Sequence, residues 1–443
     1  MAASYLPYDP KQQLLVPPAL QEWLPEGHLA YYVSDTVDAL ELSAFEARYE
    51  KGGPRNQPFH PAMMVKVLIY AYATGVFSSR KIARRLHEDV AFRVLAAGNF
   101  PAHRTISDFR ALHLKELSAL FVQVVRLARE CGLVKLGTIA VDGTKIKANA
   151  SRHKAMSYQR MQQAEAETNK QIAELLQRAQ RTDEAEGNEP DTEVPEQLKR
   201  QQERLATIQA AKARLEQRQR EADAARGRTP EDERKARNAE GKATGAYFKR
   251  EFGVPDPKAQ DSFTDPDSRV MKNCSGGFDY SYNAHAAIDE TAKLVVAAEL
   301  SNNASDADRL PVLLDAVKAN CGTDAACVVA DAGFRSEAVF AALAQGSTEV
   351  IVSLGREGQA VAKAKLGSAD TPHTAAMARK LQTEPARTLY RKRKWLSEPP
   401  HGWIKNVMGF RQFSLRGIEK VRAEWKLVCL ALNLRRMGAM LAC

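Results

Sequence analysis

The sequence lacks the features that mark membrane-spanning, secreted and disulfide-bonded proteins. None of its apolar runs is long enough to cross a bilayer. The amino-terminal stretch MAASYLPYDPKQQLLVPP has neither a basic start nor an apolar core, so it does not resemble a signal peptide. The six cysteines are scattered without a C-x-x-C pair, which predicts reduced thiols and argues against structural zinc. We therefore expect a cytoplasmic protein without a membrane partner.

Charge is unevenly distributed along the 443 residues. The chain has 64 Lys and Arg against 54 Asp and Glu, a net charge of +10. Residues 387–436 contain thirteen Lys and Arg and three Glu, so this stretch accounts for the whole excess and the remainder is neutral. A basic stretch in an otherwise neutral chain indicates a polyanionic partner. The alternative is a solvated cationic face.

Residues 1–136 are predicted to form an all-α domain. An apolar run from Pro61 ends at a glycine, as expected of a buried helix. Ser79 is predicted to cap the next helix, whose Ile82 and Leu86 turn inward. Short helices with a basic exposed face are typical of helix-turn-helix DNA-binding modules. The cations on this face are Arg80, Lys81, Arg84 and Arg85.

Long helices are predicted in two further places. Thr105 and Asp108 form a capping box before an amphipathic pattern that ends at Gly132. Residues 151–250 repeat apolar or small side chains at helical spacing on both sides of an acidic, turn-rich break, which predicts an inserted antiparallel helical hairpin, a coiled coil. Residues 251–269 are predicted to be a linker. The repeated positions are Met161, Thr168, Ile172, Leu175 and Ala179, then Leu198, Leu205, Ile208, Leu215 and Ala222.

Residues 137–150 and 270–443 are predicted to form an α/β domain. Strands are predicted at residues 138–141 and in SYNAHAAIDE, KLVVAAELS, ACVVADAGF and EVIVSLG. Helices are predicted in SDADRLPVLLDAVKANCG, in SEAVFAALAQG and from near Pro399 onward. The order β-β-β-α-β-α-β-α predicts a mixed sheet with helices on both faces.

Two aspartates follow predicted buried strands. Asp142 ends the strand at 138–141, and Asp331 ends the strand in VVADAGF. In open α/β sheets ligands bind at the carboxyl ends of strands, so these two acids can converge. A third acid, Glu398, lies in the basic stretch, and Lys405 follows it by seven residues, which predicts one shared helical face.

Three carboxylates without a nearby histidine or cysteine suit hard cations such as Mg²⁺ or Mn²⁺. Two such ions about 3.5–4 Å apart stabilise the attacking and leaving oxygens of a phosphoryl displacement. Alternatively, a strand-ending aspartate simply caps a turn. We interpret two other polar residues as structural: His285 within a strand, and Asp306 as a capping residue at a helix start.

At these residues the sequence resembles a bacterial insertion-sequence transposase of the DDE type. DGTKIKANAS resembles the block of the first family acid, Asp142, and ADAGFRS that of the second, Asp331. YRKRKWLSEPPHGWIK resembles the family signature of tyrosine, arginine, glutamate and lysine, and HPAMMVKVLIYAYATGVFSSRKIARRL resembles the family's amino-terminal helical domain. The signature residues would be Tyr390, Arg393, Glu398 and Lys405, with Lys394 an alternative to Arg393 because of the spacing to the glutamate.

The resemblance implies a ribonuclease-H-like catalytic domain that cuts and joins DNA. Asp142, Asp331 and Glu398 would be the catalytic residues and would bind two Mg²⁺ or Mn²⁺ ions. Water would attack at the transposon end to release a 3′-hydroxyl, which then attacks target DNA. Lys405 and Arg393 (or Lys394) would hold phosphates near the scissile bond.

The implied partners are double-stranded transposon terminal inverted repeats and target DNA. The protein would act on them as a homodimer or larger assembly, associated with the bacterial nucleoid. Tyr390 would contact the flanking DNA, and the cations of residues 80–85 would contact DNA through the amino-terminal domain.

Two other functions remain open from the sequence. One is a DNA-binding repressor that descends from a transposase and has lost its chemistry. The other is a metal-dependent nuclease that does not join strands. A structural coiled-coil scaffold would leave both the strand-ending acids and the localised charge unexplained.

Overall fold

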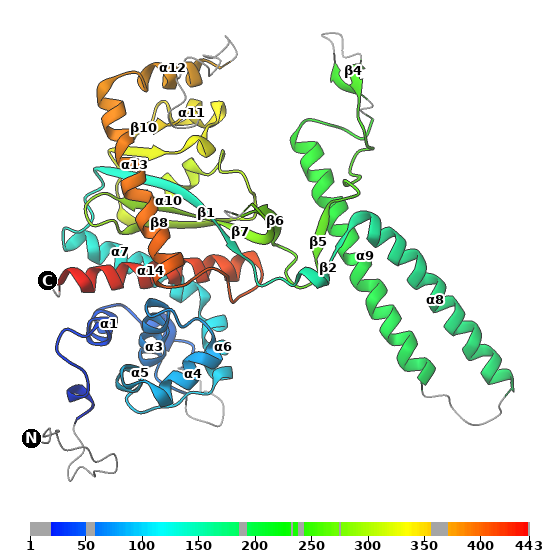
Figure 1. Ribbon diagram of the computed structural model, residues 1–443, viewed down its shortest axis with the longest axis horizontal. Helices are drawn as coiled ribbons and strands as arrows, with labels where there is room; N and C mark the ends of the chain where they lie inside the picture. Colours follow the sequence, from blue (N-terminus) through cyan, green and yellow to red (C-terminus); the bar gives the residue numbers. More distant parts are fainter. Residues whose placement is uncertain are drawn as a thin grey trace, which may run out of the picture.

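The computed structural model describes residues 19–49, 58–185, 193–231, 234–237, 243–273, 276–355 and 371–441. Figure 1 shows a sheet domain, a helical domain below it, and a helical hairpin that projects to one side. Helix α14 (Ile418–Leu441) runs between the sheet and the helical domain (Figure 1). No helix in these ranges has the length and apolar content needed to span a bilayer.

The central sheet is mixed, as predicted. In order across the sheet, β10 pairs with β9, β9 with β1, and β1 with β7, while β6 and β8 both pair with the other edge of β7. Strand β1 is parallel to β9 and antiparallel to β7. The bounds are β1 (Thr138–Lys147), β6 (Arg269–Lys272), β7 (Phe278–Asp289), β8 (Val295–Ser301), β9 (Cys327–Ala330) and β10 (Glu349–Val352).

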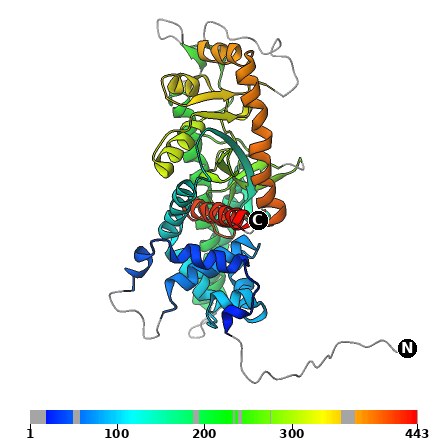
Figure 2. The ribbon, with the colours of Figure 1, turned by 90° about the vertical axis from the view of Figure 1, so that its left-hand side faces the viewer.

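Helices cover both faces of this sheet. On one face Ala140, Val329 and Ile351 pack with Leu396 of α13, which lies along one side of the domain in Figure 2. Alternate residues of the same strands, such as Val141, enter the main core on the other face, because successive strand side chains point to opposite faces. The helices are α10 (Leu310–Cys321), α11 (Glu337–Leu343), α12 (Pro372–Lys380), α13 (Glu384–Gly402) and α14, with short turns at Ala332–Phe334 and Trp403–Val407.

Strand β1 does not end at Asp142, contrary to the prediction. Its parallel pairing with β9 stops at Val141, opposite Ala330. Its antiparallel pairing with β7 continues to Lys147, opposite Ser281. The strand extends past the acid because β7 continues to pair with it, and at Lys147 the backbone of Arg411 and Phe413 bonds to its other edge. Asp142 therefore lies where one of the two partner strands stops.

Helix α13 begins fifteen residues before Pro399, where the sequence predicted the last helical region. It passes through Pro399 and Pro400, and a π-helical turn follows at Trp403–Val407. Proline lacks an N–H and disturbs the regular helical bonding, which accounts for a widened turn. Glu398 is exposed near the end of α13, and Lys405 lies in the π-helical turn, where its ammonium group contacts β1.

The helical domain differs from the prediction at its helix ends. Ser79 is the first residue of α4 and Ser78 is its cap position. The predicted long helix is two helices, α6 and α7, which break at the buried His113, and Thr105 lies inside α6 rather than capping it. The helices are α1 (Leu29–Asp38), α2 (Ser43–Glu46), α3 (Pro61–Ala73), α4 (Ser79–Glu88), α5 (Val90–Leu95), α6 (His103–Leu112) and α7 (Leu114–Glu130), after a short turn at Leu20–Glu22.

The projecting hairpin consists of α8 (Tyr158–Ala185) and α9 (Glu193–Ala225). Met161, Thr168, Ile208 and Leu215 are buried where the helices pack, but Ala222 is exposed and the following Asp223 is buried. The short strands β2 (Ala155–Ser157) and β5 (Gln260–Ser262) pair at its base, and β3 (Arg234–Arg237) pairs with β4 (Ala243–Tyr247).

The predicted linker at 251–269 is ordered by buried acids. Asp261 is buried and accepts hydrogen bonds from two α9 guanidinium groups, Arg214 at 2.6 Å and Arg218 at 2.5 Å. Asp265 is also buried and accepts a 2.8 Å bond from the Tyr282 hydroxyl of β7. These bonds join the base of the hairpin to the sheet, so this segment is part of the packed structure.

A buried hydrogen-bond chain joins the helical domain to α14. Arg110 of α6 donates to the Tyr72 hydroxyl of α3 at 2.8 Å, and this hydroxyl donates to Glu424 Oε1 at 2.8 Å. Glu424 Oε2 accepts from the backbone N–H groups of Ser414 and Leu415, both at 3.0 Å. Both carboxylate oxygens of Glu424 are thus buried and accept hydrogen bonds, which connects α14 to the helical domain.

We expect Glu424→Gln to lower the free energy of unfolding by about 1–3 kcal/mol, since the amide NH₂ would face backbone donors instead of accepting from them. Urea-induced unfolding measures the change. The matched control is Glu419→Gln on the same helix, whose side chain is 77% exposed and pairs with Arg422 at the surface. Equal stability of the two variants would contradict the importance of this junction.

Candidate active site

The strand register places Asp142 and Asp331 side by side. Val141 pairs with Ala330 in the parallel β1–β9 ladder, so the next residue of each strand is an aspartate. Neighbouring strands lie about 4.8 Å apart. Burial raises the pKa of Asp142, and burial together with the charge of Asp142 raises the pKa of Asp331. Two carboxylates thus share a partly desolvated position, where each disfavours ionisation of the other.

Arg393 of α13 faces both aspartates. Its positive charge acts to lower the pKa of Asp142 and of Asp331, opposing the effect of burial. Lys394, the alternative for this position, is exposed. Tyr390 is half-buried one turn earlier, with its ring centre 5.8 Å from the Arg393 guanidinium. The structure therefore brings Arg393, rather than Lys394, to the aspartates.

Lys405 lies against the same strand. Its ammonium group donates a hydrogen bond to the Thr144 hydroxyl and another, of 3.3 Å, to the Lys145 carbonyl oxygen. Thr144 is two residues beyond Asp142, so this contact fixes a cation next to the first acid. The π-helical turn after α13 carries Lys405 to this place.

Glu398, the predicted third acid, is exposed on α13, and the residues of α13 buried around it are Leu396, Ser397, Pro400 and His401. Within the described ranges no three His, Cys, Asp or Glu side chains converge closely enough to hold a metal ion as they stand. The paired aspartates have the oxygen donors and negative charge that suit a divalent cation.

A third acid, Asp306, lies near the two aspartates, and the capping role predicted for it from the sequence is wrong. Asp306 does not cap a helix, because α10 begins at Leu310 and has Arg309 at its cap position. Instead Asp306 Oδ1 accepts from His285 Nε2 at 2.8 Å and from Asn283 Nδ2 at 2.5 Å. Burial alone would raise the pKa of Asp306, but these hydrogen bonds and the nearby Lys145 lower it to about 2. The donors are on β7, and β8 lies between β7 and this loop in the sequence, so no local pattern could have indicated this role.

The basic face predicted for the amino-terminal domain is present on α4. Ile82 and Leu86 are fully buried, and the cations at 80, 81, 84 and 85 are exposed. Arg85 lies 3.7 Å from Asp89, so part of its charge is compensated. Figure 1 shows α4 in the helical domain, across α14 from the sheet that carries the aspartates.

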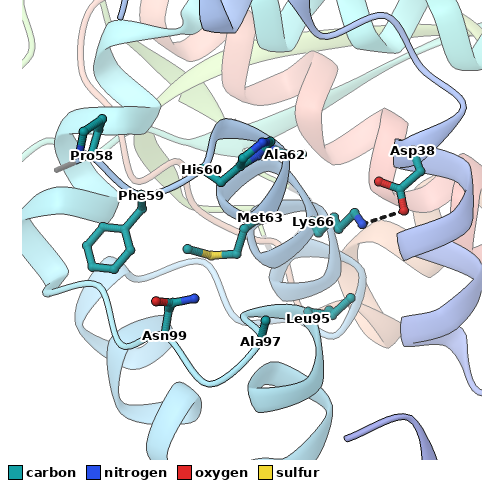
Figure 3. Close-up of a pocket in the computed structure, with 10 residues that line it drawn as sticks. All are labelled: Asp38, Pro58, Phe59, His60, Ala62, Met63, Lys66, Leu95, Ala97 and Asn99. Atoms are coloured by element: carbon teal, nitrogen blue, oxygen red, sulfur yellow. Dashed lines mark hydrogen bonds and ion pairs between the residues drawn. The ribbon is translucent and has the colours of Figure 1, made fainter. Parts of the chain in front are cut away.

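A pocket of about 580 Å³ lies in the helical domain, away from the aspartates (Figure 3). Met63 and Phe59 line it, and the Lys66–Asp38 ion pair of 2.6 Å lies at one side. Its titratable groups are thus already paired or scattered. We assign this pocket no part in the chemistry of the aspartates.

Comparison with protein families gives two matches. A family model described as "Transposase DDE domain" matches residues 254–434, and one described as "Transposase domain (DUF772)" matches residues 18–112. Neither the curated proteins nor the solved structures give a match. Both family models describe transposase domains, so the class of the protein is transposase.

The chain belongs to the transposases that join an amino-terminal transposase domain to a carboxyl-terminal DDE domain, the arrangement typical of insertion sequences. The DDE match begins at 254, inside the predicted linker, and therefore omits β1 and Asp142. In the structure β1 nevertheless lies in the centre of the sheet, between β9 and β7, which the match includes. The hairpin separates this strand from the rest of its domain in sequence only.

We expect Gly143→Ala to destabilise the protein by about 1–3 kcal/mol, because the site has no room for a methyl group. A Cβ at this position would lie 3.0 Å from Asp306 Oδ1 and 3.0 Å from His285 Cδ2. Urea-induced unfolding measures the effect. The control is Gly402→Ala, where a Cβ meets open space and helix propensity favours alanine by up to about 1 kcal/mol. A neutral result at position 143 would mean that this site is looser than described.

Proposed function

We propose that this transposase cuts DNA at the ends of its own mobile element to leave 3′-hydroxyls, and joins these ends to target DNA. The observation that carries the proposal is the pairing of Asp142 with Asp331 on neighbouring parallel strands, next to Arg393. The strand order β8-β7-β1-β9-β10, with β7 antiparallel to its neighbours β1 and β8, supports a ribonuclease-H-like catalytic domain.

In this proposal the paired aspartates hold Mg²⁺ or Mn²⁺ and are the catalytic residues. A divalent ion bound there would stabilise negative charge on the attacking and leaving oxygens of a phosphodiester. Arg393 and Lys405 would orient the phosphates beside the scissile bond, and Tyr390 would contact the flanking DNA. Glu398 would be the third acid, from the helix that also carries Arg393, with a side chain that is exposed to solvent.

The amino-terminal domain would bind the DNA ends. Its helix α4 presents exposed cations, and a groove of about 400 Å³ lies where the amino termini of α4 and α6 meet, lined by Arg80, Arg104 and His103 among others. Helix amino termini and arginines both favour phosphate. We propose double-stranded terminal repeats and target DNA as partners of a homodimer or larger assembly.

We expect the purified chain with Mg²⁺ to release 3′-hydroxyl ends from a plasmid that carries the DNA flanking its own reading frame, and to produce joined products. Asp142→Asn and Asp331→Asn should each abolish both steps, because each removes one anionic ligand. Gel analysis of labelled ends measures cutting and joining separately. Arg387→Gln, in the exposed part of α13, is the control that should retain both.

Three outcomes would contradict the proposal in different ways. Cutting without joined products would indicate a nuclease. Binding of the flanking DNA without any metal-dependent cutting would indicate a repressor. Cutting that survives in Asp142→Asn would remove the aspartate pair from the chemistry.

We expect the double change Lys81→Gln and Arg84→Gln to weaken DNA binding and its dependence on salt. The slope of log K against log salt should become shallower by about 0.9 for each phosphate that the variant no longer neutralises. Fluorescence anisotropy with a labelled duplex from the flanking DNA measures both quantities. The matched control is Lys199→Gln with Arg204→Gln, an equal charge change on exposed positions of α9. Equal slopes for the two double variants would exclude α4 from the DNA interface.

A further inference from the structure

We propose that the connecting segment, residues 408–417 between the π-helical turn and α14, binds the sugar–phosphate backbone of the terminal-repeat duplex between α4 and the paired aspartates. This inference rests on the proposed function and deepens it, because it names a DNA-binding surface that joins the helical domain to the sheet. It follows from where the segment is anchored, from which of its side chains are exposed, and from the neutral groups that orient its arginines.

The connecting segment lies along the edge of β1 that β9 leaves open after Val141. The Phe413 N–H donates a 2.9 Å hydrogen bond to the Lys147 carbonyl, and the Lys147 N–H donates a 3.2 Å bond to the Arg411 carbonyl. Lys147 follows Asp142 by five residues. Since a strand rises about 3.4 Å per residue, the segment meets β1 roughly 17 Å from the first acid.

The same segment contacts the helical domain directly before α4. The ring centres of Phe410 and Phe77 are 4.9 Å apart, and Phe77 precedes Ser78, the cap position of α4. A methyl group built on Gly75 would lie 2.6 Å from the Met408 carbonyl oxygen, so the two backbones approach closely there. The connecting segment therefore lies between the helix with the basic face and the strand with the first acid.

Buried phenylalanines hold the backbone of this segment and leave its arginines outside. Phe410 and Phe413 are 0% and 2% exposed, and their rings pack edge to face. Arg411 and Arg416 are exposed. A backbone that is already fixed loses little freedom when its side chains bind a ligand, which favours binding.

Neutral oxygens orient both arginines. Arg411 Nε donates to the Lys405 carbonyl at 3.0 Å, and its Nη2 donates to Asn406 Oδ1 at 2.6 Å. Arg416 Nε donates to the Asn149 carbonyl at 2.8 Å. Carbonyl and amide oxygens carry no net charge, so these bonds position the two guanidinium groups and leave their positive charge uncompensated.

Lys405, Arg411 and Arg416 follow one another along the open edge of β1. Lys405 contacts the strand at residues 144 and 145, the Arg411 backbone bonds to it at 147, and Arg416 contacts the chain just beyond it, at 149. Each strand of a DNA duplex carries one negative phosphate for about every 3.4 Å of helix axis. A row of cations that begins beside the acids thus fits the backbone next to a scissile phosphate. Because the segment also adjoins α4, we assign it to the duplex that α4 binds, the terminal repeat.

Fluorescence anisotropy with the full chain and a labelled duplex from the DNA that flanks its reading frame tests this surface. We expect Arg411→Gln with Arg416→Gln to weaken binding about tenfold, and the slope of log K against log salt to become shallower by roughly 1.8, for two lost phosphate contacts. Arg411→Lys with Arg416→Lys keeps both charges and should retain most of the affinity and the slope.

The matched control is Arg379→Gln with Arg387→Gln, an equal charge change at exposed arginines of α12 and α13. Arg387, like the arginines of the connecting segment, donates to a backbone carbonyl, that of Leu381. Thermal unfolding shows whether the variants fold. A double Gln variant of the connecting segment that binds like this control would overturn the inference.

Ethylation interference with the wild-type chain needs no variant. Residues 147–149 lie roughly 17–24 Å along the chain from Asp142, so ethylated phosphates about 5–7 base pairs from the cut should prevent binding. Absence of interference there would also overturn the inference, and normal cutting with loss of joining alone in the double Gln variant would assign the segment to target DNA instead. If the wild-type chain neither binds nor cuts the flanking duplex with Mg²⁺, the proposed function itself fails; if it does both and the double Gln variant matches the control, only this inference fails.

Discussion

The candidate site depends on the two different partners of strand β1. Its first half is held between β9 and β7. Its second half pairs with β7, and its other edge is bonded only near the end, by Lys405 and by the backbone of Arg411 and Phe413. The change of partner occurs at Asp142, so the backbone remains fixed while space opens on one side of the strand. Since β9 ends at the same level, its next residue, Asp331, enters that space as well. The paired strands thus hold two acids side by side although their negative charges repel each other.

Cations and buried polar contacts from other elements stabilise this acidic position. Arg393 approaches from the helix that covers one face of the sheet, and Lys405 approaches from the π-helical turn that follows it. From the other side, the Trp425 indole of α14 donates a 2.9 Å hydrogen bond to the His285 carbonyl of β7. The same helix holds the helical domain through Glu424. The helical domain and the acidic region are therefore joined through α14, by contacts that do not involve the acids themselves.

The sequence was informative where a pattern is local. The order of the predicted strands and helices indicated the mixed sheet, and the pattern of an apolar strand followed by an acid singled out Asp142 and Asp331, which the structure places side by side. It was less informative where placement depends on a helix's rotation or on a long-range contact. Glu398 is one residue from the buried Ser397, and only the packing of α13 on β1 and β9 decides which of the two turns inward. Asp306 depends on donors from two strands, and the break at His113 depends on packing against Phe45 and Phe109, neither of which a single sequence expresses.

The insertion leaves the sheet at the end of β1 and returns to it at β6. Lys147, the last residue of β1, pairs with Ser281 on one edge of β7, and Arg269, the first residue of β6, pairs with Ser281 on the other edge. The two ends of the insertion therefore lie on either side of one strand, close together in space. Evolution could consequently add, lengthen or remove the projecting arm as a cassette, because domain insertion is tolerated where the two ends are close together. The hairpin can therefore differ in length and sequence between relatives, while the strand that carries Asp142 keeps its register.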